Sequence, residues 1–256
     1  MTAPISIVEA QGQILAQPAP VLFLDTCALL DVLRVASERK NTPHRIIPAA
    51  EQVAAKADSS IPQLWLLGSD LLDVEWCDNV KTVLESASAH IAQVDSSLAK
   101  LHAVIRVTSS ILTDTRSDDF GFATAAQPPR MGAFELPRRL KEICERILTT
   151  VIRISPDDDV LRAANFRCMK RLKPAAIGKG EYPDCLIIET CFSLCRSLRS
   201  RGFVERCAFV SSNKTDFFSE SNPSQPHEDL ARECSEIGLE FAVALDHALS
   251  VLYPSK

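Results

Sequence analysis

Short apolar runs, separated by longer stretches with helical periodicity, constrain the fold of this 256-residue chain more than any other feature. The runs are residues 21–24, 64–67, 207–211 and 239–243. Runs of this length without polar alternation are typical of strands that are buried on both faces. Because strands that alternate with helices form mostly parallel sheets, the pattern predicts an α/β fold with a central, mostly parallel sheet flanked by helices.

The composition fits a chain that buries a sizeable core, since 46% of the residues are hydrophobic and 24% are charged. The net charge of −5 excludes a chain that is basic overall, but it leaves a local basic patch open. None of the nine cysteines forms a CxxC pair, which argues against zinc. Their odd number, without a signal peptide, predicts a reducing, cytoplasmic setting. No apolar run reaches the roughly 18 residues of a membrane span, so we expect no membrane partner.

A single domain is expected over residues 21–256, because the sequence contains no internal repeat or low-complexity tract. Residues 1–20 mix small and polar residues, end in a proline-containing segment, and are expected to be an N-terminal lead-in. Helices are predicted at 28–36, 49–57, 155–172, 183–200, 229–236 and 246–252, with a loop at 37–48.

A heptad repeat predicts a long helix in the middle of the chain. Apolar residues recur at alternating steps of four and three, at Val80, Leu84, Ala87, Ile91, Val94, Leu98, Leu101 and Ile105. Such a seam favours packing against another long helix. The expected partner is 134–153, which carries Leu136, Leu140, Ile143, Ile147 and Val151. We therefore expect 76–153 to be a helical hairpin, or arm, with 113–133 at its tip. Two ordinary core helices, or a homodimer formed through the arm, are the alternatives.

Four acidic residues follow these apolar runs or begin an apolar helix: Asp25, Glu75, Asp184 and Asp216. Ligands of open parallel sheets bind beyond the carboxyl ends of the strands, and each of these positions can reach that rim. Converging carboxylates repel one another unless a cation compensates their charge. Because hard oxygen ligands favour Mg²⁺ or Mn²⁺, the pattern predicts a site for one of these ions.

Simpler interpretations stay open for each of these residues. Asp25 and Asp184 could cap their helices, and Asp216 could be a turn residue. Glu75 could lie on a solvated helix face, and Asp73 and Asp78 are nearby alternatives to it.

The order of these segments resembles that of PIN-domain nucleases. Residues 23–30, an apolar strand followed by Asp25-Thr26, resemble the opening motif of that family. Glu75 matches the acidic residue on the helix after the second strand. Residues 182–187 are similar to the third motif, in which Asp184 begins an apolar helix, and residues 209–217 resemble the fourth. The resemblance covers 21–75 and 177–245, whereas the arm is larger than in compact members of the family.

The resemblance implies a metal-dependent ribonuclease of toxin-like or RNA-processing type, which hydrolyses RNA phosphodiester bonds. The catalytic and metal-holding residues would be Asp25, Glu75, Asp184 and Asp216, with Mg²⁺ or Mn²⁺ as the cofactor. Hydrogen-bonding residues behind them would be Thr26, Ser212, Asn213 and Glu189. RNA and a neutralising or regulatory protein would be the partners.

Lys170, Arg171, Lys173 and Lys179 form a dense basic stretch before Asp184. We expect them to contact RNA phosphates, and the simpler interpretation is a solvated helix end with favourable C-terminal cations.

Two other functions remain open. One is a non-catalytic PIN-like module that binds RNA or a protein through the arm. The other is a metal-dependent phosphatase, because an Asp-Thr pair at a strand end also resembles haloacid-dehalogenase phosphatases. Those enzymes need a second Asp two positions on, where this chain has Cys27.

Overall fold

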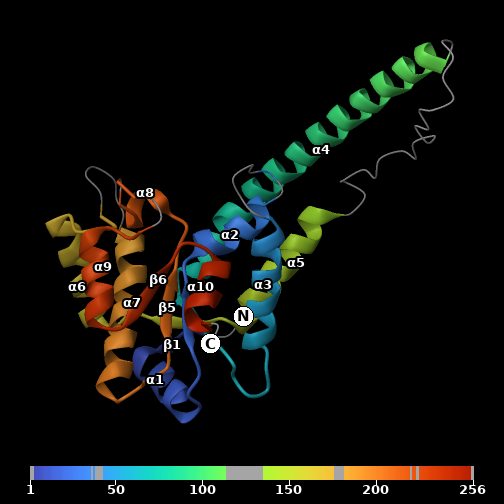
Figure 1. Ribbon diagram of the computed structural model, residues 1–256. Coiled ribbons are helices and arrows are strands. Elements are labelled where there is room, and N and C mark those ends of the chain that lie inside the picture. Colours follow the sequence, from blue (N-terminus) through green and yellow to red (C-terminus); the bar gives the residue numbers. More distant parts are fainter. Residues whose placement is uncertain are drawn as a thin grey trace.

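A sheet of six parallel strands, in the order β1-β4-β3-β2-β5-β6, forms the centre of the computed structural model (Figure 1). The structure describes residues 3–35, 37, 43–113, 135–175, 182–219, 221–222 and 225–254. The strands are β1 (Ile5–Ser6), β2 (Val21–Leu24), β3 (Trp65–Ser69), β4 (Ile152–Ser155), β5 (Cys207–Val210) and β6 (Leu239–Ala242). The parallel pairing and the flanking helices confirm the predicted α/β fold.

Successive side chains of the central strands point to two opposite layers of helices. In β2, Leu22 and Leu24 pack in one core cluster, and Val21 and Phe23 pack in the other. The first layer contains α2 (Thr26–Arg34), α3 (Pro43–Ala57), α5 (Leu136–Thr150), α10 (Leu245–Leu252) and the base of α4 (Leu72–Thr113). The second contains α1 (Ile7–Ala16), α6 (Asp158–Lys170), α7 (Tyr182–Ser200) and α9 (Glu228–Glu236). Burial on both faces explains why the central strands are continuous apolar runs.

Most of the predicted lead-in segment takes part in the sheet and its helical cover. β1 pairs with β4 at the sheet edge, and α1 packs on α7. A capping box starts α1, because Ser6 Oγ accepts the N–H of Glu9 while the Glu9 carboxylate accepts the N–H of Ser6. Ile14 is fully buried in the second core cluster. The helix thus belongs to the folded body.

β4 corrects the prediction that one helix runs to residue 153 and another starts at 155. Arg153 lies inside this strand and is only 1% exposed. Its guanidinium donates to Asp73 at 2.7 and 3.1 Å and to the carbonyl oxygens of Leu148 and Val151. These four bonds offset the cost of burying the charge, so a cation can occupy a buried strand. A second correction is that α3 begins at Pro43, inside the predicted loop at 37–48.

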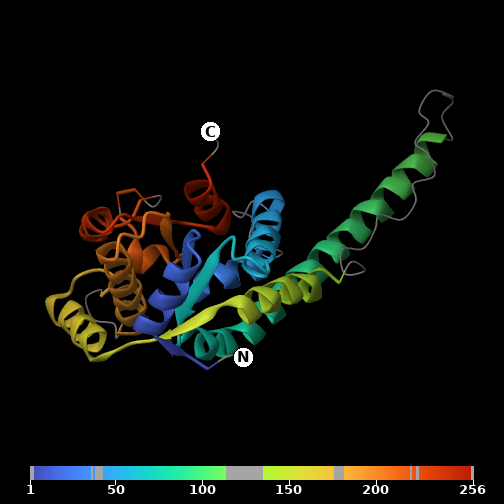
Figure 2. The same cartoon turned by 90° about the horizontal axis from the view of Figure 1, so that it is seen from below.

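α4 is a single long helix that projects from the body (Figures 1 and 2). Its 42 residues correspond to about 63 Å at 1.5 Å per residue, whereas the 15 residues of α5 correspond to about 22 Å. The long helical insertion is therefore confirmed, but α5 packs mainly on α3 and α2 and meets α4 near its base. The physical reason is that Leu140, Cys144 and Ile147 turn the buried side of α5 to the first core cluster. The predicted tip, 113–133, falls outside the described residues after Thr113.

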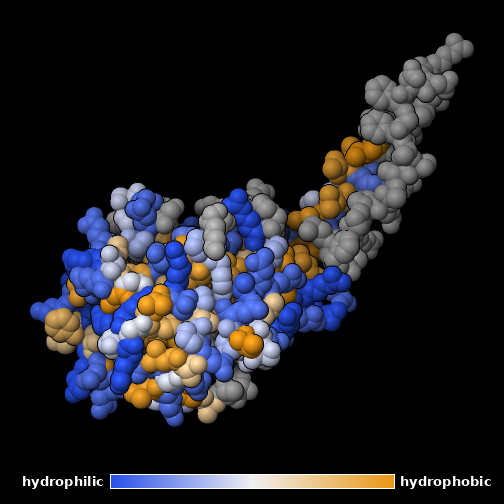
Figure 3. All heavy atoms as spheres, turned by 60° about the horizontal axis from the view of Figure 1, so that its bottom comes forward, coloured by the Kyte–Doolittle hydropathy of each residue, from blue (hydrophilic) through white to orange (hydrophobic). Residues whose placement is uncertain are grey.

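Apolar side chains lie at the surface of the projecting part of α4 (Figure 3), where Leu101 and Val104 are 56% and 61% exposed. Within the described ranges, no helix combines the length and the hydropathy needed to cross a membrane.

Candidate acidic site at the carboxyl edge of the sheet

The chain changes direction across the sheet between β2 and β5. From β2 it proceeds through β3 and β4 to one side, whereas β5 and β6 lie on the other side. Beyond the carboxyl ends of the strands, such a switch point is the usual place for a ligand in an open parallel sheet. Asp25 directly follows β2, and Ser211 directly follows β5. Both residues therefore lie at the switch point.

Asp25 is a buried carboxylate that is held by a hydroxyl from the neighbouring strand. Its residue is 2% exposed, and Ser211 Oγ donates to its Oδ2 at 2.5 Å. Ser211 Oγ also accepts the N–H of Asn213 at 3.1 Å, which ties the turn after β5 to the same carboxylate. Although Asp25 occupies the N-cap position of α2, its side chain makes no capping hydrogen bond. Helix capping therefore does not explain this residue.

Two neighbouring carboxylates at this edge have raised pKa values. The pKa of Asp25 is raised to about 6, chiefly by burial; the hydrogen bond from Ser211 opposes the shift and the charge of Glu75 adds to it. Glu75 lies on the first turn of α4, and burial raises its pKa against the hydrogen bond that Thr26 Oγ1 donates to Oε2 at 2.5 Å. Positive charge placed here would stabilise both ionised carboxylates.

Asp184 and Asp216 come from two further elements. Asp184 lies on the first turn of α7. Burial raises the pKa of the Cys27 thiol, and the charges of Asp25 and Asp184 raise it further, so Asp184 acts on the same region as Asp25. Asp216 lies on the short helix α8 (Lys214–Phe217), and its buried Oδ1 has no hydrogen-bond partner among the described residues. A buried carboxylate oxygen without a partner is costly and calls for an explanation.

The four carboxylates are not gathered around one point. In the part of the chain that the structure describes, no group of three or more His, Cys, Asp or Glu side chains lies close enough to hold a metal ion. The donor chemistry nevertheless fits Mg²⁺ or Mn²⁺, which prefer carboxylate oxygens, and Asp216 Oδ1 is available as a ligand. Convergence on a shared ion stays a prediction.

Arg153 and solvent account for the two alternatives to Glu75. Asp73 forms the ion pair with Arg153 described above, so a structural role explains it. Asp78 is exposed on the side of α4. Glu75, bonded to Thr26 and close to Asp25, is thus the acidic residue of this helix that belongs to the edge.

Ser211 is the polar residue at the switch point that sequence analysis does not single out. The predicted Ser212 and Asn213 lie on the same turn, but the hydroxyl that bonds Asp25 comes from Ser211. Two adjacent serines follow β5, and no local signal separates them. The register that pairs Leu24 with Val210 sets Ser211 opposite Asp25, and this register is a property of the folded sheet.

Glu189, also predicted to support the site, belongs to an ion network with α6 and α9. Arg167 is 2% exposed and donates to Glu189 at 2.6 Å. It also donates to both carboxylate oxygens of Glu233 at 2.9 Å and to the carbonyl oxygen of Lys173 at 2.6 Å. These contacts explain the acidic residue in an apolar helix as the partner of a buried cation.

The basic stretch reaches the acidic edge through Lys173. Its Nζ donates to the carbonyl oxygen of Thr215 at 3.1 Å, and Thr215 directly precedes Asp216. Lys170 ends α6 and Arg171 follows it as the C-cap residue. Lys179 lies outside the described residues.

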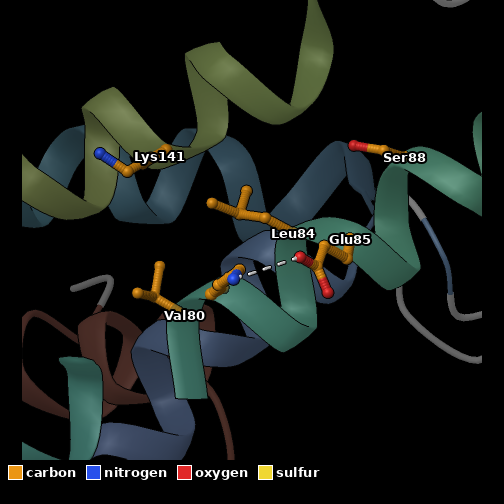
Figure 4. Close-up of a pocket in the computed structure, with 6 residues that line it drawn as sticks. Val80, Leu84, Glu85, Ser88 and Lys141 are labelled. Carbon is orange, nitrogen blue, oxygen red and sulfur yellow. Dashed lines mark ion pairs between the residues drawn. The ribbon is translucent and has the colours of Figure 1, made fainter. Parts of the chain in front are cut away.

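A groove of about 530 Å³ lies at the base of the arm and is lined by none of the predicted site residues. Figure 4 shows its lining from two helices: Val80, Leu84, Glu85 and Ser88 come from α4, and Lys141 comes from α5. An ion pair of 4.0 Å joins Lys81 to Glu85 at its side. The groove is mostly apolar and has no catalytic constellation of its own.

The sequence and the structure were compared with protein-family models, curated proteins and solved structures, and none of the three comparisons gave a match.

Proposed function

We propose that this chain is a PIN-like ribonuclease that hydrolyses RNA phosphodiester bonds with Mg²⁺ or Mn²⁺. Its catalytic residues would be Asp25, Glu75, Asp184 and Asp216. The observation that carries the proposal is the state of Asp25: it is buried at the switch point, its pKa is raised, and a second carboxylate acts on it. A structural carboxylate is expected to pair with a cation, as Asp73 does with Arg153, whereas Asp25 is held by a neutral hydroxyl.

In this proposal, the chain supplies ligands and fixes their directions. Asp25 and Glu75 would hold the cation from one side, and Asp184 and Asp216 would complete its coordination. Ser211 and Thr26 would keep the first two carboxylates oriented, since each donates a hydrogen bond of 2.5 Å to one of them. The bound cation would lower the pKa of a water molecule and stabilise charge on the phosphate.

The test is cleavage of a labelled RNA with Mn²⁺, with Mg²⁺ and with EDTA. Asp25→Asn should lower the rate at least about 100-fold, because even outer partners of metal ligands contribute 10–100-fold. Asp78→Asn is the matched control, since it removes an exposed carboxylate from the helix that carries Glu75. Full activity in Asp25→Asn, or an equal loss in Asp78→Asn, would contradict the proposal. Release of phosphate from a monoester with the RNA left intact would favour a phosphatase instead.

A second candidate is a non-catalytic binding module or homodimer that acts through α4. The supporting observation is the exposure of Leu101 and Val104 on the projecting helix, together with the apolar groove at its base. Light scattering at high concentration separates the cases. A dimer that dissociates in Leu101→Glu would support association through the arm, and a strict monomer would remove the homodimer.

A further inference from the structure

An aromatic ring and a thioether lie among cations on the outer face of α6. Phe166 is 55% exposed and Met169 is 80% exposed. Lys170 is four residues after Phe166 and shares its helix face, and its Nζ lies 5.6 Å from the centre of the ring. We call Phe166, Met169, Lys170 and Arg171 the α6 surface.

The α6 surface ends beside the acidic edge. Arg171 takes a left-handed conformation, with φ of 54°, and turns the chain at the end of α6. Two residues later, Lys173 donates to the carbonyl oxygen of Thr215, next to Asp216. Arg167 fixes this turn from the interior, because it donates to the carbonyl oxygen of Lys173 at 2.6 Å.

The charge that the α6 surface presents is positive. The carboxylates of Glu189 and Glu233 are bonded to the buried Arg167, whereas Lys170 and Arg171 are exposed. The acidic residues of α6 itself, Asp157, Asp158 and Asp159, lie at its opposite end. A local positive field attracts anions even on a protein with a net charge of −5.

Favourable cations at a helix C-terminus would account for Lys170 and Arg171 by themselves. They do not account for an exposed ring and thioether on the same face. A ring beside cations is the combination with which proteins bind single-stranded nucleic acid, because bases stack on the ring and phosphates meet the cations.

We propose that the α6 surface binds single-stranded RNA and leads it to the acidic edge. The choice of RNA as the ligand rests on the ribonuclease function proposed above. An unpaired base stacks on Phe166 with Met169 beside it, and Lys170 and Arg171 contact the adjoining phosphates. A duplex fits this surface poorly, because its bases are stacked on one another and their faces are not accessible.

The test is the affinity of the full-length protein for a fluorescent oligouridine of about 12 nucleotides, a length within the range that single-strand sites occupy. Anisotropy is measured in EDTA, so that metal-dependent cleavage does not interfere. Phe166→Ala should weaken binding about 5- to 100-fold, and Phe166→Trp should retain it because the indole still stacks. Lys170→Gln should reduce the slope of log Kd against log salt by about 0.7, the value for one lost phosphate contact on a single strand.

Arg201→Gln is the control for charge, since Arg201 is exposed on the turn after α7 and is not part of the α6 surface. It should leave the affinity unchanged. Wild-type affinity in Phe166→Ala, an equal loss in Arg201→Gln, equal affinity for a duplex, or no binding by the wild type would overturn the proposal. Because binding is measured without metal, a protein that binds RNA but never cleaves it with Mn²⁺ contradicts the ribonuclease function and leaves the α6 surface supported.

Discussion

Arg153 and Asp25 are both buried charges, and they differ in what compensates them. Arg153 is surrounded by a carboxylate and two carbonyl oxygens, which is the full pairing expected of a structural ion. Asp25 has the hydroxyl of Ser211 on one side and the like charge of Glu75 nearby, and its pKa is raised to about 6. Strongly shifted carboxylates at a switch point are typical of sites that bind ligands or perform chemistry.

Asp25→Asn should stabilise the metal-free protein above pH 6. Because the pKa rises from 3.8 to about 6 on folding, ionisation of Asp25 disfavours the folded state, and wild-type stability falls as the pH rises through this range. The loss amounts to roughly 3 kcal/mol at most. The amide of Asn stays neutral, so the difference between variant and wild type should vanish below about pH 4. Urea unfolding in EDTA from pH 4 to 7.5 measures it. A difference that does not depend on pH would show that Asp25 carries no such penalty.

Ser211→Ala should destabilise the fold by about 1–3 kcal/mol, because it removes a buried donor to Asp25 and the acceptor of the Asn213 N–H. Loss of this donor should also raise the pKa of Asp25 further. Ser212→Ala, on the same turn, is the control and should change stability by less than about 0.5 kcal/mol. Equal effects of the two substitutions in urea unfolding would argue against the particular role of Ser211.

At the scale of elements, the strands that sequence analysis predicts are those whose residues are apolar throughout. β2, β3, β5 and β6 are recognisable in this way. β4 is missed because Arg153 interrupts its apolar pattern, and the partner that permits this, Asp73, is 80 residues away in the chain. α1 is missed because its glutamines and Gly12 weaken both the apolar pattern and the helix propensity. Contacts distant in sequence, which local patterns do not contain, decide both elements.

Ile14→Ala tests whether α1 is part of the folded body. Ile14 is fully buried, and its truncation should cost about 2–5 kcal/mol of unfolding free energy. Val8→Ala is the control on the same helix, since Val8 is 72% exposed and should matter little. If both variants unfold at the same urea concentration as the wild type, α1 is dispensable and residues 1–20 act only as a lead-in.

Arg167→Met tests the ion network that joins α6, α7 and α9. Removal of the cation leaves the buried Glu189 without its partner and should cost about 3–5 kcal/mol. Arg162→Met removes an exposed cation from the same helix, where Arg162 pairs with Asp159, and should cost about 1 kcal/mol or less. Chemical unfolding of the two variants side by side measures the difference. A small effect of Arg167→Met would mean that packing, not the network, holds these helices together.

At the scale of the whole molecule, strand order is what brings distant acidic residues to one edge. The sequence shows that Asp25 and Asp216 follow apolar runs, but it does not show that β5 lies beside β2. The arm illustrates the same limit. Its heptad seam predicts the long helix α4, whereas the packing of α5 on α3 depends on a core cluster assembled from several elements.

Crystals soaked in Mn²⁺ and measured for anomalous scattering test the central claim most directly. We expect a peak within coordination distance of Asp25 and of at least two of Glu75, Asp184 and Asp216. In the Asp25→Asn variant, the same peak should be lost or strongly reduced. An edge that never takes up the ion, or carboxylates that stay apart while the ion binds elsewhere on the molecule, would contradict a metal-dependent site at the switch point.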